Sequence, residues 1–431
     1  MRLLIRNGRV IDPSSGLDET LDVLIAEGKI VSVEPRIEGV DAAVIDASRL
    51  VVAPGFIDMH THVREPGQEK KEDIVSASRA AARGGFTTIC AMPNTNPVND
   101  SRRVTEYIIT ESRKRAIINI LPIAAITMGL AGEELTDMDD LTASGAVAFS
   151  DDGRGVQNSR LMKLALDRAE KLNALIIEHC EDSNLSLGGV MNEGPTSLFL
   201  GLQGIPPAAE DVMVSRDIIL AAGAGARLHI AHLSTRGAVD LVREARRKKI
   251  QVTAEVTPHH LVLADTALKT RDPNLKVNPP IRGAEDVQAL HEAIKDRIVD
   301  VFATDHAPHQ TDQKGLGFAQ APFGIAGLET AVSLLLDRLV SRYVLPLAQL
   351  IEMFSSRPAE ILGLRAKGRI LPGADADLTI LNLHREMTVD VRHFVSKSRN
   401  SPFDGWRLKG APEMTIRGGR VVYPFNHPAG T

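Results

Sequence analysis

The sequence has few aromatic residues, few cysteines and no long hydrophobic run, and each absence excludes a class of protein. Its 431 residues include only 11 Phe, 3 Tyr and 1 Trp, which provide little material for a surface that stacks bases. Two cysteines cannot form the disulfide framework of a secreted domain, so we expect reduced thiols and a cytoplasmic location. No stretch of about 18 consecutive apolar residues suggests a transmembrane helix.

Charge is balanced along the chain. There are 50 Lys and Arg against 55 Asp and Glu, and the longest run of one sign is the RRKK that begins at Arg246. We therefore expect no nucleic-acid partner and no membrane anchor. Small polar and titratable side chains must carry the chemistry. Ten of the 13 histidines lie in the stretch from His60 to His309, which is the first indication of a site.

The two ends of the chain share one pattern. The first 50 residues contain short strands such as LLIRNGRVID and LDVLIAEGKIVSVE, in which Glu27 and Gly28 suit a hairpin turn. The tail repeats this pattern in GADADLTILNL, MTIRGG and RVVY. Each end is too small to fold well alone. We expect residues 1–53 and 366–431 to form one small β-sandwich domain together.

The middle of the chain, residues 54–365, alternates strand-like apolar runs with segments of helical period. One helical segment, KEDIVSASRAAARGG, ends at Gly84 and Gly85. Eight strands alternating with helices favour a (β/α)₈ TIM-like barrel. An open doubly wound sheet is the alternative, but no GxGxxG or P-loop follows any strand. The eight runs are VVAPGFIDMH, FTTICAMP, IINILPIAAI, AVAFSDD, ALIIEHC, RLHIAHLS, QVTAEVTPHH and VDVFATDHAPH.

The predicted strand ends are rich in metal ligands, and a barrel places catalytic groups at the C-terminal ends of its strands. Residues i and i+2 of a strand face the same side, so His60 and His62 can grip one cation. The ligands exceed what one tetrahedral zinc uses, which indicates two metals. Two divalent ions need an anionic bridge, which a carboxylate or a carbamylated lysine could provide. No lysine lies between Lys114 and Lys163, so the Asp151 and Asp152 pair is the natural source of this bridge. The remaining strand-end ligands are His179, His232 and Asp305.

These residues and their neighbours resemble the amidohydrolase superfamily, and specifically the class I dihydroorotases. The resemblance covers nearly the whole chain. It implies that His60, His62 and Asp305 bind one zinc ion, that His179 and His232 bind the other, and that Asp152 bridges the two. The motifs that carry it are GFIDMHTHVREPG, GGFTTICAMPNTNPV, AVAFSDDG, EHCED, HIAHLST, KVNPPIR and DVFATDHAPH.

The resemblance also implies a reaction, the reversible cyclisation of N-carbamoyl-L-aspartate to L-dihydroorotate in pyrimidine synthesis. A hydroxide bridging two zinc ions would be the nucleophile, and Asp305 would carry the proton to and from the amide nitrogen. A long segment, from Gln310 to Gly327, is a candidate functional loop. The implied contacts to the anionic substrate are His62, Arg64, Asn94, Asn278, His309, Phe323 and Gly324.

Two other functions fit parts of this pattern. Hydantoinases and allantoinases share DxHxH and hydrolyse related cyclic ureides, but the missing lysine of the fourth strand and the presence of Arg64 and Asn94 favour a dihydroorotase. A catalytically silent scaffold for aspartate transcarbamoylase would typically lack metal ligands, and here every matched ligand is present. The sequence leaves open a homodimer and an association with aspartate transcarbamoylase. Cys180 and His306 are expected to be structural, because their side chains point away from the neighbouring ligands.

Overall fold

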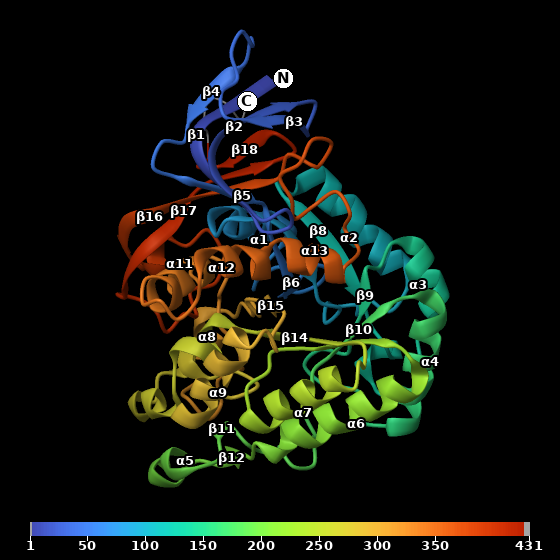
Figure 1. The fold of residues 1–431 in the computed structure, drawn as a ribbon. Coiled ribbons are helices and arrows are strands. Elements are labelled where there is room, and N and C mark those ends of the chain that lie inside the picture. Colours follow the sequence, from blue (N-terminus) through green and yellow to red (C-terminus); the bar gives the residue numbers. More distant parts are fainter. Residues whose placement is uncertain (1, 426–431) are drawn as a thin grey trace.

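The computed structural model describes residues 2–425, and its elements form two regions (Figure 1). Met1 and residues 426–431, at the outer ends of the two predicted terminal segments, lie outside the described residues. The middle of the chain forms a parallel barrel surrounded by helices, and strands from both ends of the chain form a mixed sheet beside it.

Eight parallel strands form the barrel in sequence order. Between the last and the first strand, an isolated parallel bridge joins His306 to Thr61, so the barrel is nearly closed and the predicted fold class is confirmed. The strands are β6 (Phe56–Thr61), β7 (Phe86–Ala91), β8 (Asn119–Ala124), β9 (Ala148–Phe149), β10 (Leu175–Glu178), β13 (Arg227–Ile230), β14 (Val252–Val256) and β15 (Val301–Phe302). A separate two-stranded sheet contains β11 (Met191–Asn192) and β12 (Gly204–Ile205).

The predicted first strand, VVAPGFIDMH, is wrong as a single strand. Its first half is β5 (Val51–Pro54), which pairs with the terminal strands, and only the second half is the barrel strand β6. Gly55 lies between the two halves, where an added Cβ would lie 2.3 Å from Thr87 Oγ1. The chain passes from one sheet to the other at a point where only glycine fits.

The terminal strands form one mixed sheet, in the order β18-β17-β16-β5-β1-β2-β3 with β4 beside β1. Glu27 and Gly28 have φ values of 51° and 74° and make the predicted hairpin turn. The sheet has its own buried core, which includes Leu3, Val23 and Ile380. Its strands are β1 (Arg2–Asp12), β2 (Leu17–Ala26), β3 (Lys29–Glu34), β4 (Ala43–Asp46), β5, β16 (Leu378–Thr388), β17 (Arg407–Arg417) and β18 (Arg420–Tyr423).

Helices cover the outside of the barrel (Figure 1). Helix α1 begins after Asp73, which accepts from Ser76 N in a capping box, and ends at the predicted Gly84. The longer helices are α1 (Ile74–Arg83), α2 (Arg102–Arg115), α3 (Met138–Ser144), α4 (Ser159–Leu172), α6 (Ala208–Ala224), α7 (Arg236–Arg247), α9 (Ala284–Lys295) and α12 (Leu347–Phe354). Shorter ones are α5 (Pro195–Leu200), α8 (Pro258–Val262), α10 (Thr311–Lys314), α11 (Ala331–Leu335) and α13 (Ser356–Ile361). The 3₁₀ turns are η1 (Met128–Leu130), η2 (Asp265–Thr270), η3 (Pro273–Leu275) and η5 (Val391–His393), and η4 (Leu336–Val340) is a π-helical turn.

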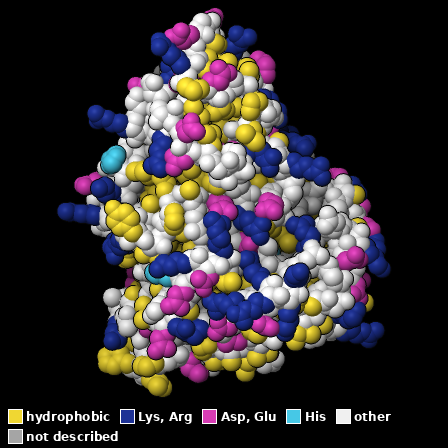
Figure 2. All heavy atoms as spheres, in the orientation of Figure 1, with side chains coloured by type: hydrophobic (Ala, Val, Ile, Leu, Met, Phe, Trp, Pro, Cys, Tyr) yellow, Lys and Arg dark blue, Asp and Glu magenta, His cyan; other side chains and the backbone are white. Residues whose placement is uncertain are grey.

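Basic and acidic side chains are interspersed over the face shown in Figure 2. Apolar side chains gather at the tip that carries α5, where Leu198 and Phe199 are 82% and 75% exposed. Within residues 2–425, no helix combines the length and the apolar character needed to cross a membrane.

Candidate active site

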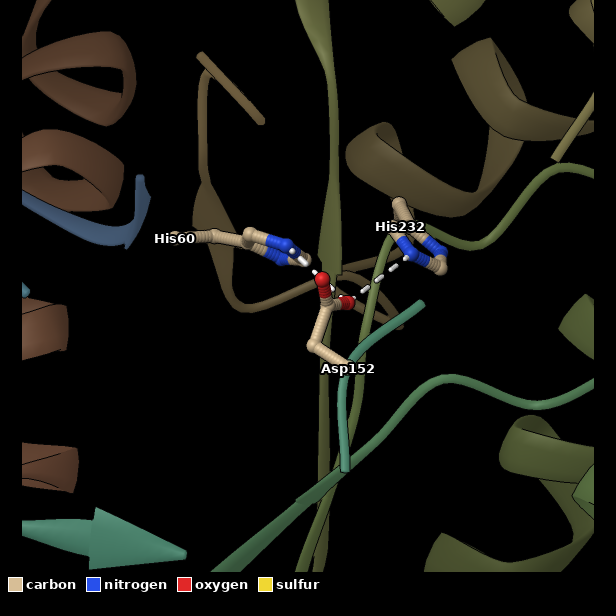
Figure 3. Close-up of side chains that lie close together, drawn as sticks. All are labelled: His60, Asp152 and His232. Carbon is tan, nitrogen blue, oxygen red and sulfur yellow. Dashed lines mark ion pairs between the residues drawn. The ribbon is translucent and has the colours of Figure 1, made fainter. Parts of the chain in front are cut away.

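Three barrel strands bring His60, Asp152 and His232 together (Figure 3). His60 belongs to β6, whereas Asp152 and His232 follow β9 and β13. The Asp152 carboxylate lies between the two imidazoles, with its Oδ1 atom 3.2 Å from His60 Nε2 and 3.8 Å from His232 Nε2. All three side chains are buried. The arrangement suits a cation held between carboxylate oxygen and imidazole nitrogen.

A second group of ligands shares His60 with the first. Asp305, after β15, places Oδ1 3.1 Å from His62 Nε2 and 3.5 Å from His60 Nε2. His179, after β10, extends the first group, because its Nδ1 lies 2.9 Å from His232 Nε2 and 3.7 Å from Asp152 Oδ1. The residues predicted as metal ligands therefore form one buried cluster with two overlapping ligand sets.

Several atoms of this cluster have no hydrogen-bond partner. His60 Nε2, Asp152 Oδ1 and His232 Nδ1 are buried and without a hydrogen bond among the described residues. Buried polar atoms are costly unless they are paired. A bound cation would supply partners for His60 Nε2 and Asp152 Oδ1, which face each other, so the donor set fits a metal site.

The electrostatics of the cluster also favour a cation. Burial opposes protonation of His60, but the carboxylates of Asp152, Glu255 and Asp305 outweigh it and raise its pKa well above the usual value. Burial likewise opposes ionisation of Asp152, yet the His60 imidazole holds the pKa of that carboxyl well below its usual range. The cluster therefore concentrates negative charge that attracts protons or a metal ion.

Glu255 supports the cluster from β14, although it was not among the predicted site residues. Its fully buried carboxylate lies 2.6 Å from His60 Nδ1 and 3.1 Å from His229 Nε2. Such a bond fixes the ring orientation of a metal-binding histidine and leaves its other nitrogen for the metal. The available signal was a single acidic residue inside an otherwise uncharged strand, QVTAEV.

The neighbours of the ligands have other partners. Asp151 accepts hydrogen bonds from the backbone N–H groups of Ile126 and Thr127, so Asp152 alone of the pair reaches the cluster. Cys180 is buried, and its thiol lies 3.7 Å from Asp217 Oδ2. His306 Nε2 lies 3.2 Å from Glu72 Oε2. Asp151, Cys180 and His306 therefore contact groups outside the cluster. This agrees with the structural role that we expected for Cys180 and His306.

A pocket of about 320 Å³ opens above the cluster. It is lined by every residue predicted as a ligand or substrate contact except His60, which lies fully buried beneath it. Besides Asp152 and His232 of the cluster, three lining residues carry a buried polar atom that has no hydrogen bond within residues 2–425: Arg64 Nε, Asn278 Oδ1 and His309 Nδ1. These atoms are available to a ligand. The lining comprises His62, Arg64, Asn94, Asp152, Gly153, His179, His232, Asn278, Asp305, Ala307, His309, Pro322, Phe323 and Gly324.

Arg64 provides a positive charge within this pocket. The guanidinium forms no ion pair in the described part of the chain. Burial lowers its pKa, but only to about 10. It therefore stays protonated at neutral pH. Arg64, His232 and Asp305 have φ values of 66°, 30° and 45°, a left-handed conformation that is costly for side chains other than glycine. Strained backbone of this kind is typical of functional sites.

The loop from Gln310 to Gly327 forms one wall of the pocket. Gly324 has φ 137°, and an added Cβ would lie 2.7 Å from the Ala307 carbonyl oxygen, so the position requires glycine. Phe323 accepts a hydrogen bond from His309 Nε2 through its carbonyl oxygen at 2.7 Å. Buried Lys314, at the end of α10, donates to the carbonyl oxygen of Pro322 at 2.8 Å. These contacts hold the loop against the pocket.

A barrel whose strand ends carry this buried His and Asp cluster defines a hydrolase of the amidohydrolase class. A model described as "Amidohydrolase family" matches residues 222–423, and one described as "Dihydro-orotase-like" matches residues 48–238. The chain is 51% identical to a dihydroorotase of Pelotomaculum thermopropionicum over 98% of both chains, and 49% identical to one of Geobacter metallireducens over 98% of this chain and all of the other. The chain belongs to the dihydroorotase family.

A solved structure, L-hydantoinase (dihydropyrimidinase) from Arthrobacter aurescens, has a similar fold. It matches with a TM-score of 0.89 and 26% sequence identity, over 97% of this chain and 95% of its own. The fold is thus shared with hydantoinases, whereas the much higher sequence identity is to dihydroorotases. The resemblance found in the motifs is confirmed.

Proposed function

We propose that the chain catalyses the reversible cyclisation of N-carbamoyl-L-aspartate to L-dihydroorotate in pyrimidine synthesis, with two zinc ions bridged by Asp152. The observation that carries this proposal is the pocket in which Arg64, Asn94 and His309 lie beside the His and Asp cluster. A small anionic ureide needs a cation and amide groups beside the reacting bond, and the pocket offers both.

The chain's own residues would hold the two metal ions in the overlapping groups described above. His60, His62 and Asp305 would bind one ion, and His179 and His232 the other. When bound, such a pair of ions lowers the pKa of a water molecule and polarises an amide carbonyl. Glu255 would keep His60 in the tautomer that offers Nε2 to a metal.

The remaining steps belong to side chains of the pocket. Arg64 would bind the substrate carboxylate, and Asn94 and Asn278 would orient the ring through their amide groups. Asn94 is itself held by its contact with His62, whose Nδ1 lies 2.9 Å from Asn94 Oδ1. During hydrolysis of the ring, Asp305 would take a proton from the attacking water and pass it to the departing amide nitrogen. Cyclisation would follow the same steps in reverse.

His309 has one ring nitrogen left for a ligand. The Phe323 carbonyl oxygen can only accept, so His309 Nε2 carries the proton of that hydrogen bond and Nδ1 remains free. We assign Nδ1 to the substrate. Phe323 and Gly324 would contribute backbone groups from the same wall.

Two assays on one preparation test this function. The purified chain should contain about two zinc ions and interconvert carbamoyl aspartate and dihydroorotate. The similarity to the solved hydantoinase makes a hydantoinase the second candidate. A metal-loaded chain that ignored dihydroorotate and hydrolysed hydantoins or allantoin would overturn the proposal, and a chain inactive on all of these would support the silent scaffold.

Replacing Arg64 with Met is expected to weaken substrate binding more than turnover. The substitution keeps the aliphatic stem but removes the charge that would pair with the carboxylate. We expect KM for dihydroorotate to rise about 10- to 100-fold, with unchanged metal content. Steady-state kinetics check this, and an unchanged KM would show that another group binds the carboxylate.

The sequence left open a homodimer and an association with aspartate transcarbamoylase, and both can be measured directly. Sedimentation of the chain alone tests the homodimer, and sedimentation with an aspartate transcarbamoylase tests that association. The cytoplasmic location inferred from the two cysteines likewise stays a prediction.

A further inference from the structure

The segment from Ser396 to Asn400 forms part of the wall behind the pocket, although it lies far along the chain. Ser396, Ser398 and Asn400 are buried at 1%, 2% and 3% exposure, and they alternate with the less buried Lys397 and Arg399. Alternate residues of an extended segment face the same side. Ser398 Oγ donates to the carbonyl oxygen of Lys71 at 2.8 Å, and Ser396 Oγ donates to the Glu72 carboxylate. The segment therefore packs against the loop that follows β6.

Both the nitrogen and the oxygen of the Asn400 side-chain amide contact residues that line the pocket. Its Nδ2 donates to the carbonyl oxygens of Ala307 and Gly324, both at 3.0 Å. Its Oδ1 accepts from the backbone N–H of His309 at 3.2 Å. Its own carbonyl oxygen accepts from Ala326 N at 2.9 Å. Every one of these side-chain contacts is to the backbone of a residue that lines the pocket.

The Asn400 carboxamide contacts two loops that form walls of the pocket, and it adds to the direct contacts between them, which are Ala307 N to the Ile325 carbonyl oxygen at 2.8 Å and His309 Nε2 to the Phe323 carbonyl oxygen. Ala307 and His309 follow β15, whereas Gly324 lies beyond α10 on the long loop. The position of the His309 backbone determines where its Nδ1 points, and the position of Gly324 determines how close the chain approaches a ligand. Asn400 itself does not line the pocket. It can therefore affect a ligand only through these neighbours.

We infer that Asn400 is a positioning residue for substrate binding, which aligns His309 and Gly324 from behind the pocket. This inference rests on the proposed function of the pocket. The site requires two donors beside one acceptor, because two carbonyl oxygens face one end of the side chain and an N–H faces the other. An aspartate of the same shape would direct an oxygen at two carbonyl oxygens and leave them without a donor.

The Asn400→Asp variant tests the inference with little change in volume. We expect KM for dihydroorotate to rise about tenfold or more at pH 8, with a smaller change in kcat, because the metal ligands and Asp305 do not contact Asn400. Zinc content should match that of the wild-type chain. Protonation of the new carboxyl restores one donor, so the ratio of variant to wild-type KM should shrink as the pH falls.

A matched control is the same substitution at Asn99, another fully buried asparagine. Its Nδ2 donates to the carbonyl oxygen of Ile123 at 2.7 Å and its Oδ1 accepts from Thr105 Oγ1 at 2.7 Å, and it does not line the pocket. Asn99→Asp should lower the melting temperature while KM stays within about twofold of wild type. Equal KM changes in both variants would reduce Asn400 to a structural residue and overturn the inference.

Asn400→Ala covers the case in which the aspartate variant does not fold. It removes the donors without adding a charge, and it should also raise KM while metal content is kept. A folded Asn400 variant with wild-type KM overturns the inference, provided that the wild-type chain turns over dihydroorotate. If the wild-type chain does not, the proposed function itself fails, so the two failures are distinguishable.

Discussion

Replacing Asp305 with Asn is expected to lower kcat by about 10²- to 10⁴-fold in both directions of the reaction. The carboxamide has the same shape and still offers an oxygen to a metal, but it cannot take up a proton as a carboxylate does. Asparagine also tolerates the left-handed backbone at this position, where φ is 45°. The loss should therefore reflect the missing proton acceptor rather than misfolding.

The measurement combines steady-state kinetics with metal analysis of the same protein. A suitable control is Asp151→Asn, since Asp151 accepts backbone hydrogen bonds from Ile126 and Thr127 away from the cluster. That variant should keep kcat within a few fold of wild type. If Asp305→Asn held its metal and kept a near-normal rate, Asp305 would be a ligand only, and the proton would have to move through another group.

The strand-end histidines and aspartates could be predicted because two local rules place them. Alternate residues of a strand face one side, and all strands of a parallel barrel end at the same face. His60 and His62 obey the first rule, and His179, His232 and Asp305 obey the second. Residues separated by more than 200 positions could therefore be assigned to one site from the sequence, without information on how the segments between them pack.

Other features depend on packing between distant segments, which leaves no local pattern. Glu255 contacts His60 across 195 positions, and an acidic residue in a strand does not reveal which histidine it supports. Asn400 contacts residues of two loops, and its motif SKSRN shows only the alternation of a buried extended segment. The two sheets were misassigned at Gly55 for the same reason, because β5 and β6 form one continuous apolar run.

Removal of bound metal is expected to abolish dihydroorotate turnover and to lower the thermal stability of the chain. Without a cation, the buried carboxylates and imidazoles of the cluster lose the partner that would offset the cost of burying them. Free metal at 100 to 1,000 times its Kd would stabilise the folded chain by about 3 to 4 kcal/mol. Both effects are measured by calorimetric melting and by turnover on the same protein. The measurements are made before chelation, after chelation and after zinc is added back. A chain shown to be metal-free that kept its turnover would contradict the metal assignment.

Zinc binding by the metal-free chain should also strengthen as the pH rises. Burial opposes protonation of His60 and His179, but nearby carboxylates raise the pKa of both rings above the usual value. A raised pKa means that these rings hold protons to a higher pH than a free imidazole does, and zinc must displace any proton from the nitrogen that it occupies. Each displaced proton changes the apparent Kd by roughly tenfold per pH unit until the pH exceeds the raised pKa. Titration calorimetry in buffers of different ionisation enthalpy should detect the release of protons when zinc binds. Binding without proton release would show that the imidazoles are already neutral, and that the carboxylates of the cluster are balanced in another way.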